Sequence, residues 1–189
     1  PATVKFIPGT ENFDSLWPCC YSWRHTVTGK TAEGEILKED QFGLKLKTPL
    51  DQNSVYVLLE HPLAGRDSID GYEFPDPDDL DPHFENFAKI IRQEYPDRFI
   101  NAKIDAGIFL TTQLLFGLEE FLLLFAANPQ AATEAYARVA DYYKHLVIKY
   151  KNAGAHMITV FEDVGGTGGL LINPATWRKL FKPILADVY

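Results

Sequence analysis

Two short strand-like segments separated by a long helical stretch constrain this chain most. The segment "RFINAKID" (residues 98–105) and the segment "HMITVF" (156–161) are both rich in apolar and β-forming residues, and the second is expected to be a buried strand. Between them, apolar residues recur at helical spacing, most clearly over residues 129–153. Strands connected through such a helix run parallel, with the helices outside the sheet. The pattern therefore predicts an α/β fold over residues 81–189.

Three Asx-Pro pairs mark the expected starts of helices. In each pair, a side chain that can accept from a first-turn N–H precedes a proline at the first helical position. The pairs are Asp81-Pro82, Asn128-Pro129 and Asn173-Pro174. We expect the last helix to be kinked at Pro183, whose ring cannot continue the backbone ladder.

An apolar run over residues 108–127 is long enough to raise the question of a membrane span. Glu119 and Glu120 stand near its middle, and a central acid costs roughly 3 kcal/mol on insertion. We therefore expect a buried helical hairpin or a helix broken at Gly117, and no membrane span.

The first part of the chain has a different sequence pattern. Residues 1–66 are expected to hold mostly irregular structure over residues 1–34, with a short helix near Asp14, followed by a small antiparallel β meander, because apolar and polar residues alternate between 44 and 48. Residues 67–80 form an acidic, proline-rich connector that should be solvated and without regular structure. We expect the three segments, 1–66, 67–80 and 81–189, to make one domain.

Acidic residues follow both predicted strands. Asp105 ends the first, and Glu162 with Asp163 ends the second. Ligands of parallel α/β sheets and barrels bind at the C-terminal strand ends, so all three are candidate catalytic residues. Neighbouring strand residues point to opposite faces, and we expect Asp163 to face the ligand while Glu162 bonds to structure. The alternative for Asp105 is a helix cap.

The loop "GGTGG" (165–169) follows the acidic pair. It lacks the Gly-Lys-Ser/Thr of a phosphate loop, and it does not fit G-x-G-x-x-G, because Leu171 stands at the third glycine position. We expect Gly165, Gly166 and Gly168 to form a flexible wall of the binding site, with a plain linker as the alternative. His61, which follows a predicted strand, is a further candidate for substrate binding.

Composition excludes some classes of partner. The net charge of −8 argues against nucleic acid and anionic membranes, since both need a basic surface. The two cysteines, Cys19 and Cys20, are adjacent, and no paired Cys-x-x-Cys spacing is present. No metal site is predicted in this segment, and a cytoplasmic location is the simplest expectation.

Two stretches carry a resemblance to a known family. "LLEHPL" with "DGYEFPDPDDLDPHFENFAKII", and above all "AGAHMITVFEDVGGTGGLLINPATWRKLFKPIL", resemble the uroporphyrinogen decarboxylase superfamily. The resemblance implies a TIM (β/α)8 barrel, of which this chain covers only part. Its members include the haem-pathway decarboxylase and cobalamin-dependent methyltransferases.

The resemblance also implies functional alternatives. Gln113 occupies the position of a tyrosine of the decarboxylases and becomes a substrate-binding candidate, and Asp163 replaces a serine. These departures count against decarboxylation, and corrinoid-dependent methyl transfer to a thiol or similar acceptor is the leading expectation. Porphyrinogen decarboxylation and a non-catalytic tetrapyrrole- or corrinoid-binding protein are the alternatives. A methyltransferase would use a corrinoid, carried on a corrinoid protein, and a zinc whose ligands would lie beyond Tyr189. Residues before Pro1 and after Tyr189, and a homodimer, are further expectations.

Overall fold

The computed structural model describes residues 25–48, 56–104 and 106–189. The chain divides into two compact units, each made of discontinuous segments. One contains residues 23–75 and 108–139, and the other contains residues 76–107 and 140–189. Helix α4 (Pro129–Ala153) contributes its first part to one unit and its second part to the other.

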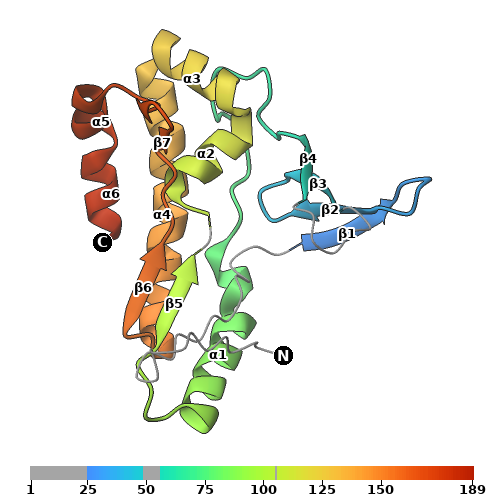
Figure 1. Ribbon diagram of the computed structural model, residues 1–189, viewed down its shortest axis with the longest axis vertical. Coiled ribbons are helices and arrows are strands. Elements are labelled where there is room, and N and C mark those ends of the chain that lie inside the picture. Colours follow the sequence, from blue (N-terminus) through green and yellow to red (C-terminus); the bar gives the residue numbers. More distant parts are fainter. Residues whose placement is uncertain (1–24, 49–55, 105) are drawn as a thin grey trace. The chain divides into compact units, whose positions relative to one another are not determined.

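The predicted antiparallel meander is confirmed in the first unit (Figure 1). It has the strand order β1-β2-β3-β4, formed by β1 (His25–Lys30), β2 (Ile36–Asp40), β3 (Lys45–Thr48) and β4 (Val57–Glu60). Leu44 and Leu46 are buried, as the alternation requires. The expectation of irregular structure was wrong for residues 25–30, which pair with β2. The expected helix near Asp14 lies outside the described residues.

The apolar run 108–127 is a broken helix, as predicted. Helices α2 (Ile108–Phe116) and α3 (Leu118–Ala127) meet at 95°. Gly117 between them has φ +96°, a conformation that L side chains rarely adopt, and a Cβ there would lie 3.4 Å from the His61 ring. In the described part of the chain no single helix has the length and apolarity of a membrane span, although this bent pair meets both criteria when taken together.

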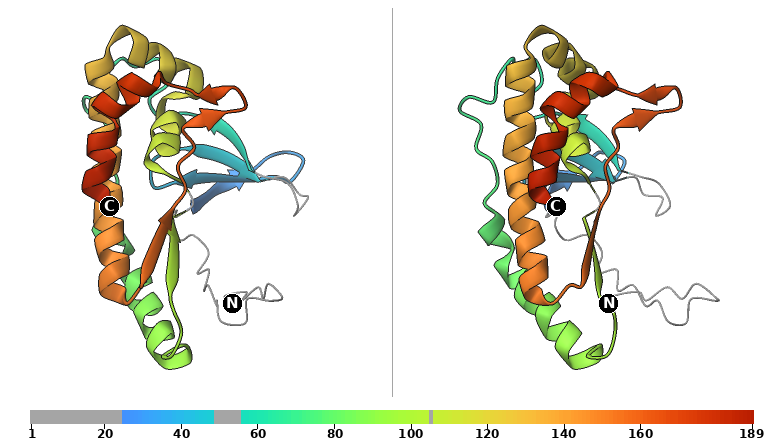
Figure 2. Two further views of the ribbon diagram at one scale, coloured as in Figure 1. Left: turned by 60° about the vertical axis from the view of Figure 1, so that its left-hand side comes forward. Right: turned by 90° about the vertical axis from the view of Figure 1, so that its left-hand side faces the viewer.

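The second unit is built on the predicted parallel strands. Strands β5 (Asn101–Ile104) and β6 (Met157–Val160) pair in parallel over four residues each. Figures 1 and 2 show them side by side, with the second part of α4 along one side of the sheet. Ala102 and Ile104 are fully buried. The expectation that residues 156–161 are buried was wrong, because Met157 and Phe161 are each about half exposed.

The helical stripe predicted along α4 is buried throughout. Its side chains are at most 1% exposed: Ala132, Tyr136, Val139, Tyr143, Leu146 and Tyr150. In the second unit, Tyr150 packs edge-on against Phe84 and Phe87 of α1 (Asp81–Glu94). The long amphipathic connection between β5 and β6 thereby supplies the hydrophobic cover that a short parallel sheet needs.

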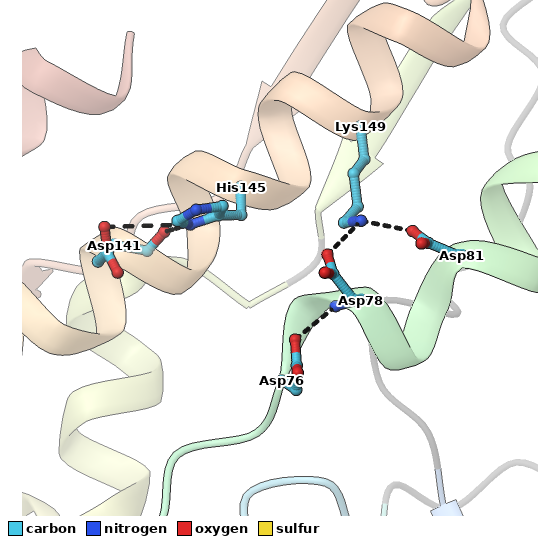
Figure 3. Close-up of polar contacts among 6 residues, drawn as sticks. All are labelled: Asp76, Asp78, Asp81, Asp141, His145 and Lys149. Atoms are coloured by element: carbon cyan, nitrogen blue, oxygen red, sulfur yellow. Dashed lines mark hydrogen bonds and ion pairs between the residues drawn. The ribbon is translucent and has the colours of Figure 1, made fainter.

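An ion-pair cluster attaches the start of α1 to α4 (Figure 3). The Lys149 ammonium lies 2.7 Å from the Asp78 carboxylate and also bonds to that of Asp81. Hydrogen bonds and charge from these two carboxylates raise the pKa of Lys149. Asp76 accepts from the Asp78 N–H and caps the 3-10 turn η1 (Pro77–Leu80). The connector 67–80, expected to lack regular structure, therefore ends in one ordered turn.

The helix starts were predicted with mixed success. Asn128 accepts from the Ala131 N–H and Asn173 from the Ala175 N–H, which confirms both as caps. Asp81 is no N-cap, since the turn η1 runs directly into α1 and Leu80 takes that position. The last helix is divided at Phe181 into α5 (Pro174–Leu180) and α6 (Lys182–Val188) rather than only kinked, with Pro183 in the first turn of α6.

The turn between β2 and β3 is organised around a buried carboxyl group. Asp40 Oδ1 accepts hydrogen bonds from the Phe42 and Leu44 N–H groups at 2.9 and 2.8 Å. Its Oδ2 is buried and has no hydrogen-bond partner among the described residues. Burial therefore raises the pKa of Asp40 to about 6, although the two backbone hydrogen bonds act in the opposite direction.

Asp40→Asn should remove a loss of folding stability that the wild-type protein shows as the pH rises. A folded-state pKa above the unfolded value means that the carboxyl group's contribution is present at acid pH and is lost as pH rises through about 6. Asparagine keeps an acceptor for the two N–H groups and cannot ionise. We expect the wild-type urea midpoint to fall relative to that of Asp40→Asn between pH 4 and 7. A constant difference across this range would contradict the assignment, and Asp40→Ala serves as the control that loses the acceptor.

Candidate functional site

The C-terminal ends of β5 and β6 lie together in the second unit. The parallel register pairs Ile104 with Val160, and the Phe161 N–H donates to the Ile104 carbonyl at 3.2 Å. The acidic pair Glu162 and Asp163 follows at once on the β6 side. Asp105, the remaining predicted catalytic residue, lies outside the described residues, so its role stays a prediction.

Gly107 fixes how closely the two strand ends approach. A Cβ on this residue would lie 2.0 Å from the Phe161 carbonyl oxygen and 2.7 Å from Cδ of Glu162. No side chain fits in this space, because real Cβ contacts are essentially never below 3.0 Å. The glycine therefore lets the segment after β5 pack directly on the segment after β6.

The acidic pair is divided by this packing. The Glu162 side chain rests against Gly107 and is half-buried, whereas Asp163 is exposed. Both residues take part in further interactions. The arrangement is compatible with the expectation that Asp163 faces a ligand while Glu162 serves the structure, which remains a prediction about function.

The two faces of the β5–β6 sheet differ in chemistry. Residues paired in parallel register lie on the same side, so Ala102, Ile104, Ile158 and Val160 share the apolar face. The opposite face carries Asn101, Lys103, Met157 and Thr159. On it the Thr159 hydroxyl donates to Asn101 Oδ1 at 3.0 Å. This second face thus combines polar groups with exposed apolar surface.

The glycine loop is an ordered hairpin. Strands β7 (Gly165–Gly166) and β8 (Gly169–Leu170) pair antiparallel, and the Leu171 N–H donates to the Val164 carbonyl. Figure 2 shows the hairpin extending beyond β6 and away from α5 and α6. Among its glycines only Gly169 has a positive φ, +128°. Strand pairing satisfies backbone groups of this loop, and its expected role as a flexible wall of the binding site stays a prediction.

His61 and Gln113 belong to the other unit. His61 Nδ1–H donates to the Leu114 carbonyl at 2.6 Å, and the Leu63 N–H donates to the Leu115 carbonyl at 2.8 Å. These bonds satisfy carbonyls that the end of α2 leaves without helical partners. Gln113 is buried, 7% exposed, on the same helix. The structure thus gives His61 a helix-capping contact, and a role of either residue in substrate binding stays a prediction.

The described residues contain no cluster of three or more His, Cys, Asp or Glu side chains that could hold a metal ion. A groove of about 380 Å³ lies elsewhere in the second unit, between α1 and the end of α4. It is lined by Asp81, Phe84, Glu85, Ala88, Arg92, Lys149, Asn152 and Ala153. Its lysine is already held by two carboxylates, and no predicted site residue lines it. We therefore place the candidate site at the strand ends and not in this groove.

Comparisons with known proteins show the family and the fold of the chain. The model of the family described as Uroporphyrinogen decarboxylase (URO-D) matches residues 37–189. The chain belongs to this family. A methyltransferase from Methanosarcina mazei has a similar structure, with a TM-score of 0.64 over 78% of this chain and 18% identity. No curated protein matches the sequence.

The structural likeness is a likeness of fold, since the identity is low. The chain spans 43% of the length of that methyltransferase. Mixed α/β content, parallel β5 and β6 and the family match fit a TIM-barrel superfamily. The described residues contain one pair of parallel strands, β5 and β6, which cannot close a barrel by themselves. A closed barrel is therefore part of the proposed function.

Sequence reasoning missed two features of the site. The sequence "DAG" places Gly107 directly after a predicted strand. A glycine at such a position can indicate a close approach of two backbone segments. Lys103, on the polar face of β5, was not predicted as a site residue. In "NAKI", the polar Asn101 and Lys103 alternate with the apolar Ala102 and Ile104. This alternation predicts that Lys103 lies on the face opposite the buried residues.

Gly107→Ala should destabilise the second unit by about 2 kcal/mol or more, because the added methyl group overlaps the Phe161 backbone. Gly168→Ala is the matched control, since a Cβ there meets nothing within 4 Å. The control should change the free energy of unfolding by less than about 0.5 kcal/mol. Urea unfolding followed by circular dichroism measures both. Equal stability of the two variants would show that the strand ends do not meet at Gly107.

Proposed function

We propose that this chain is part of a TIM-barrel enzyme that transfers a methyl group from a corrinoid to a thiol or similar acceptor, in the cytoplasm. The observation that carries the proposal is the exposed Asp163 carboxylate at the C-terminal end of a parallel strand, beside a glycine hairpin. Membership of the uroporphyrinogen decarboxylase family and the likeness to a methyltransferase support the choice.

The chemistry assigned to Asp163 is that of a hydrogen-bond acceptor for the acceptor substrate. A carboxylate in this position binds the S–H or N–H donor of a substrate and orients it toward the reacting carbon. If a thiol is the acceptor, its sulfur would bond to the methyl group as the bond between that group and its donor breaks, with the electron pair left on the donor. The Asp163 carboxylate would stabilise the positive charge that develops on the thiol and accept its proton. Glu162 holds the geometry through its packing against Gly107.

Of the two expected cofactors, a corrinoid fits the described residues and zinc does not. The described residues contain no cluster of ligands for zinc. A corrinoid, which supplies the methyl group, is a broad ligand, and the hairpin offers exposed backbone flanked by Leu170 and Leu171, 45% and 39% exposed. Close backbone approach and apolar contact are the contributions of this chain to such a ligand. A separate corrinoid protein and a second copy of the chain are the proposed partners.

Decarboxylation of uroporphyrinogen is the second candidate, favoured by the description of the matching family. There Asp163 would hold pyrrole N–H groups, and no cofactor would be required. The full-length protein should be assayed with a methyl corrinoid plus a thiol, and separately with uroporphyrinogen. Methyl transfer alone supports the first reaction, and decarboxylation alone the second. Activity in neither assay, with a corrinoid or tetrapyrrole still bound, would indicate a non-catalytic binding protein.

Asp163→Asn should reduce kcat of the full-length enzyme about 100-fold or more, because the amide cannot stabilise the developing charge. The exposed position predicts a change in the free energy of unfolding below about 0.5 kcal/mol. Glu162→Gln is the comparison variant. It should change the free energy of unfolding more than Asp163→Asn does, because the Glu162 side chain packs against Gly107. Matching losses of stability and activity in Asp163→Asn would assign the residue to structure.

The hairpin can be tested with two substitutions that its geometry tolerates. A Cβ on Gly166 would be 3.8 Å from Leu171, and one on Gly168 meets nothing within 4 Å. Neither residue has a positive φ. The double variant Gly166→Ala, Gly168→Ala should therefore keep its unfolding midpoint while corrinoid affinity falls about tenfold, because two methyl groups hold the ligand away from the backbone. Unchanged affinity in the folded double variant would leave the hairpin as a linker.

A further inference from the structure

The groove between α1 and the end of α4 has a polar rim and apolar surface at its centre. Its volume of about 380 Å³ falls within the range of small-molecule sites. Buried Phe84 and Ala88 of α1 and Ala153, the last residue of α4, contribute the apolar surface. The two alanine side chains are too short to fill the space between the helices, so a ligand can reach this surface.

Charged residues of α1 follow one edge of the groove. Asp81, Glu85, Ala88 and Arg92 are spaced by four, three and four residues, which places them on one face of the helix. Two acids therefore stand in the first half of α1 and a guanidinium group near its end. The seven residues from Glu85 to Arg92 span about 10 Å along the helix axis. The groove is thus negative toward one end and positive toward the other.

The charges at the Asp81 end are already paired with each other. Lys149 binds both Asp78 and Asp81, and these contacts close this end of the groove (Figure 3). Glu85 and Arg92 are exposed, and within the described part of the chain their side chains form no hydrogen bond or ion pair. One carboxylate and one guanidinium group, which has five N–H donors, therefore remain for a ligand.

Arg92 has a special place among the cations of the second unit. Among the described residues, Arg92 and Lys149 are the lysines and arginines that line the groove. The others of this unit lie away from it: Lys89, Arg98, Lys103, Lys144, Lys151, Arg178, Lys179 and Lys182. Since Lys149 is held by two carboxylates, an anionic group that enters the groove meets the guanidinium of Arg92.

We propose that this groove binds an elongated organic zwitterion. The ligand's carboxylate accepts two hydrogen bonds from the Arg92 guanidinium, a geometry that suits both planar groups. Its ammonium group donates to the Glu85 carboxylate, and its apolar middle covers Ala88 and Ala153. Helix α4 ends shortly before β6 begins, so this site lies toward the starts of the strands, whereas the acidic pair follows their ends. The inference goes beyond the proposed function and does not rest on it.

The test uses 4-(2-aminoethyl)benzoate as probe, titrated into the full-length protein and followed by saturation-transfer NMR. The wild-type protein should bind it saturably. Arg92→Gln and Glu85→Gln each remove one of the two charges and should each raise Kd at least fivefold. The matched controls are Arg178→Gln on α5 and Glu94→Gln at the end of α1, because both residues are exposed and lie outside the groove. Both controls should bind the probe as the wild-type protein does.

Two analogues with one charge each assign the ends of the ligand. 4-Ethylbenzoate has no ammonium group, so it should bind more weakly than the zwitterion, lose affinity in Arg92→Gln and be insensitive to Glu85→Gln. 2-Phenylethylamine has no carboxylate and should show the opposite dependence. Ala153→Leu places a larger side chain in the centre of the groove and should weaken binding of all three compounds, with urea unfolding checking that the variant is folded.

Three results would overturn the proposal. The first is the absence of saturable probe binding by the wild-type protein. The second is equal affinity for the zwitterion and its one-charge analogues. The third is a loss of affinity in Arg178→Gln as large as that in Arg92→Gln, because binding would then reflect surface charge in general. Binding is measured without turnover, so each result is independent of whether the protein transfers methyl groups.

Discussion

The direct contact between the segments that follow β5 and β6 is the constraint on which the candidate site depends. Parallel strands need a long connection, and here it is the helical stretch that ends in α4. Pairing of the strands brings Gly107 onto the backbone of Phe161, where no side chain has room. Everything placed at this edge, the acidic pair and the hairpin included, takes its position from that contact.

Polar groups at the ends of elements are satisfied by neighbours that are distant in sequence. In the first unit, His61 and Leu63 bond to the last carbonyls of α2. In the second, the Ile100 N–H donates to His156 Nδ1 at 3.0 Å at the start of the sheet, while Lys149 binds the carboxylates that precede and begin α1. Such bonds give partners to polar groups at the ends of elements, which short elements need in order to be stable.

Charges of opposite sign stand close to the end of one two-stranded sheet. Lys103 lies on the polar face, and Asp163 follows β6 in an exposed position. The backbone between them belongs to Phe161 and Glu162, one residue offering an exposed ring and the other packed on Gly107.

Local pattern alone determined the α/β texture, the parallel pair of strands, the meander and the break at Gly117, because periodicity and turn residues act over a few positions. It also gave Asn128 and Asn173 as caps, but not Asp81, whose carboxylate is drawn to Lys149 on another helix. Only the tertiary structure decided that Glu162 packs on Gly107 while Asp163 stays exposed, and that Lys103 meets Phe161. These contacts join residues more than fifty positions apart, and no local pattern encodes such a distance.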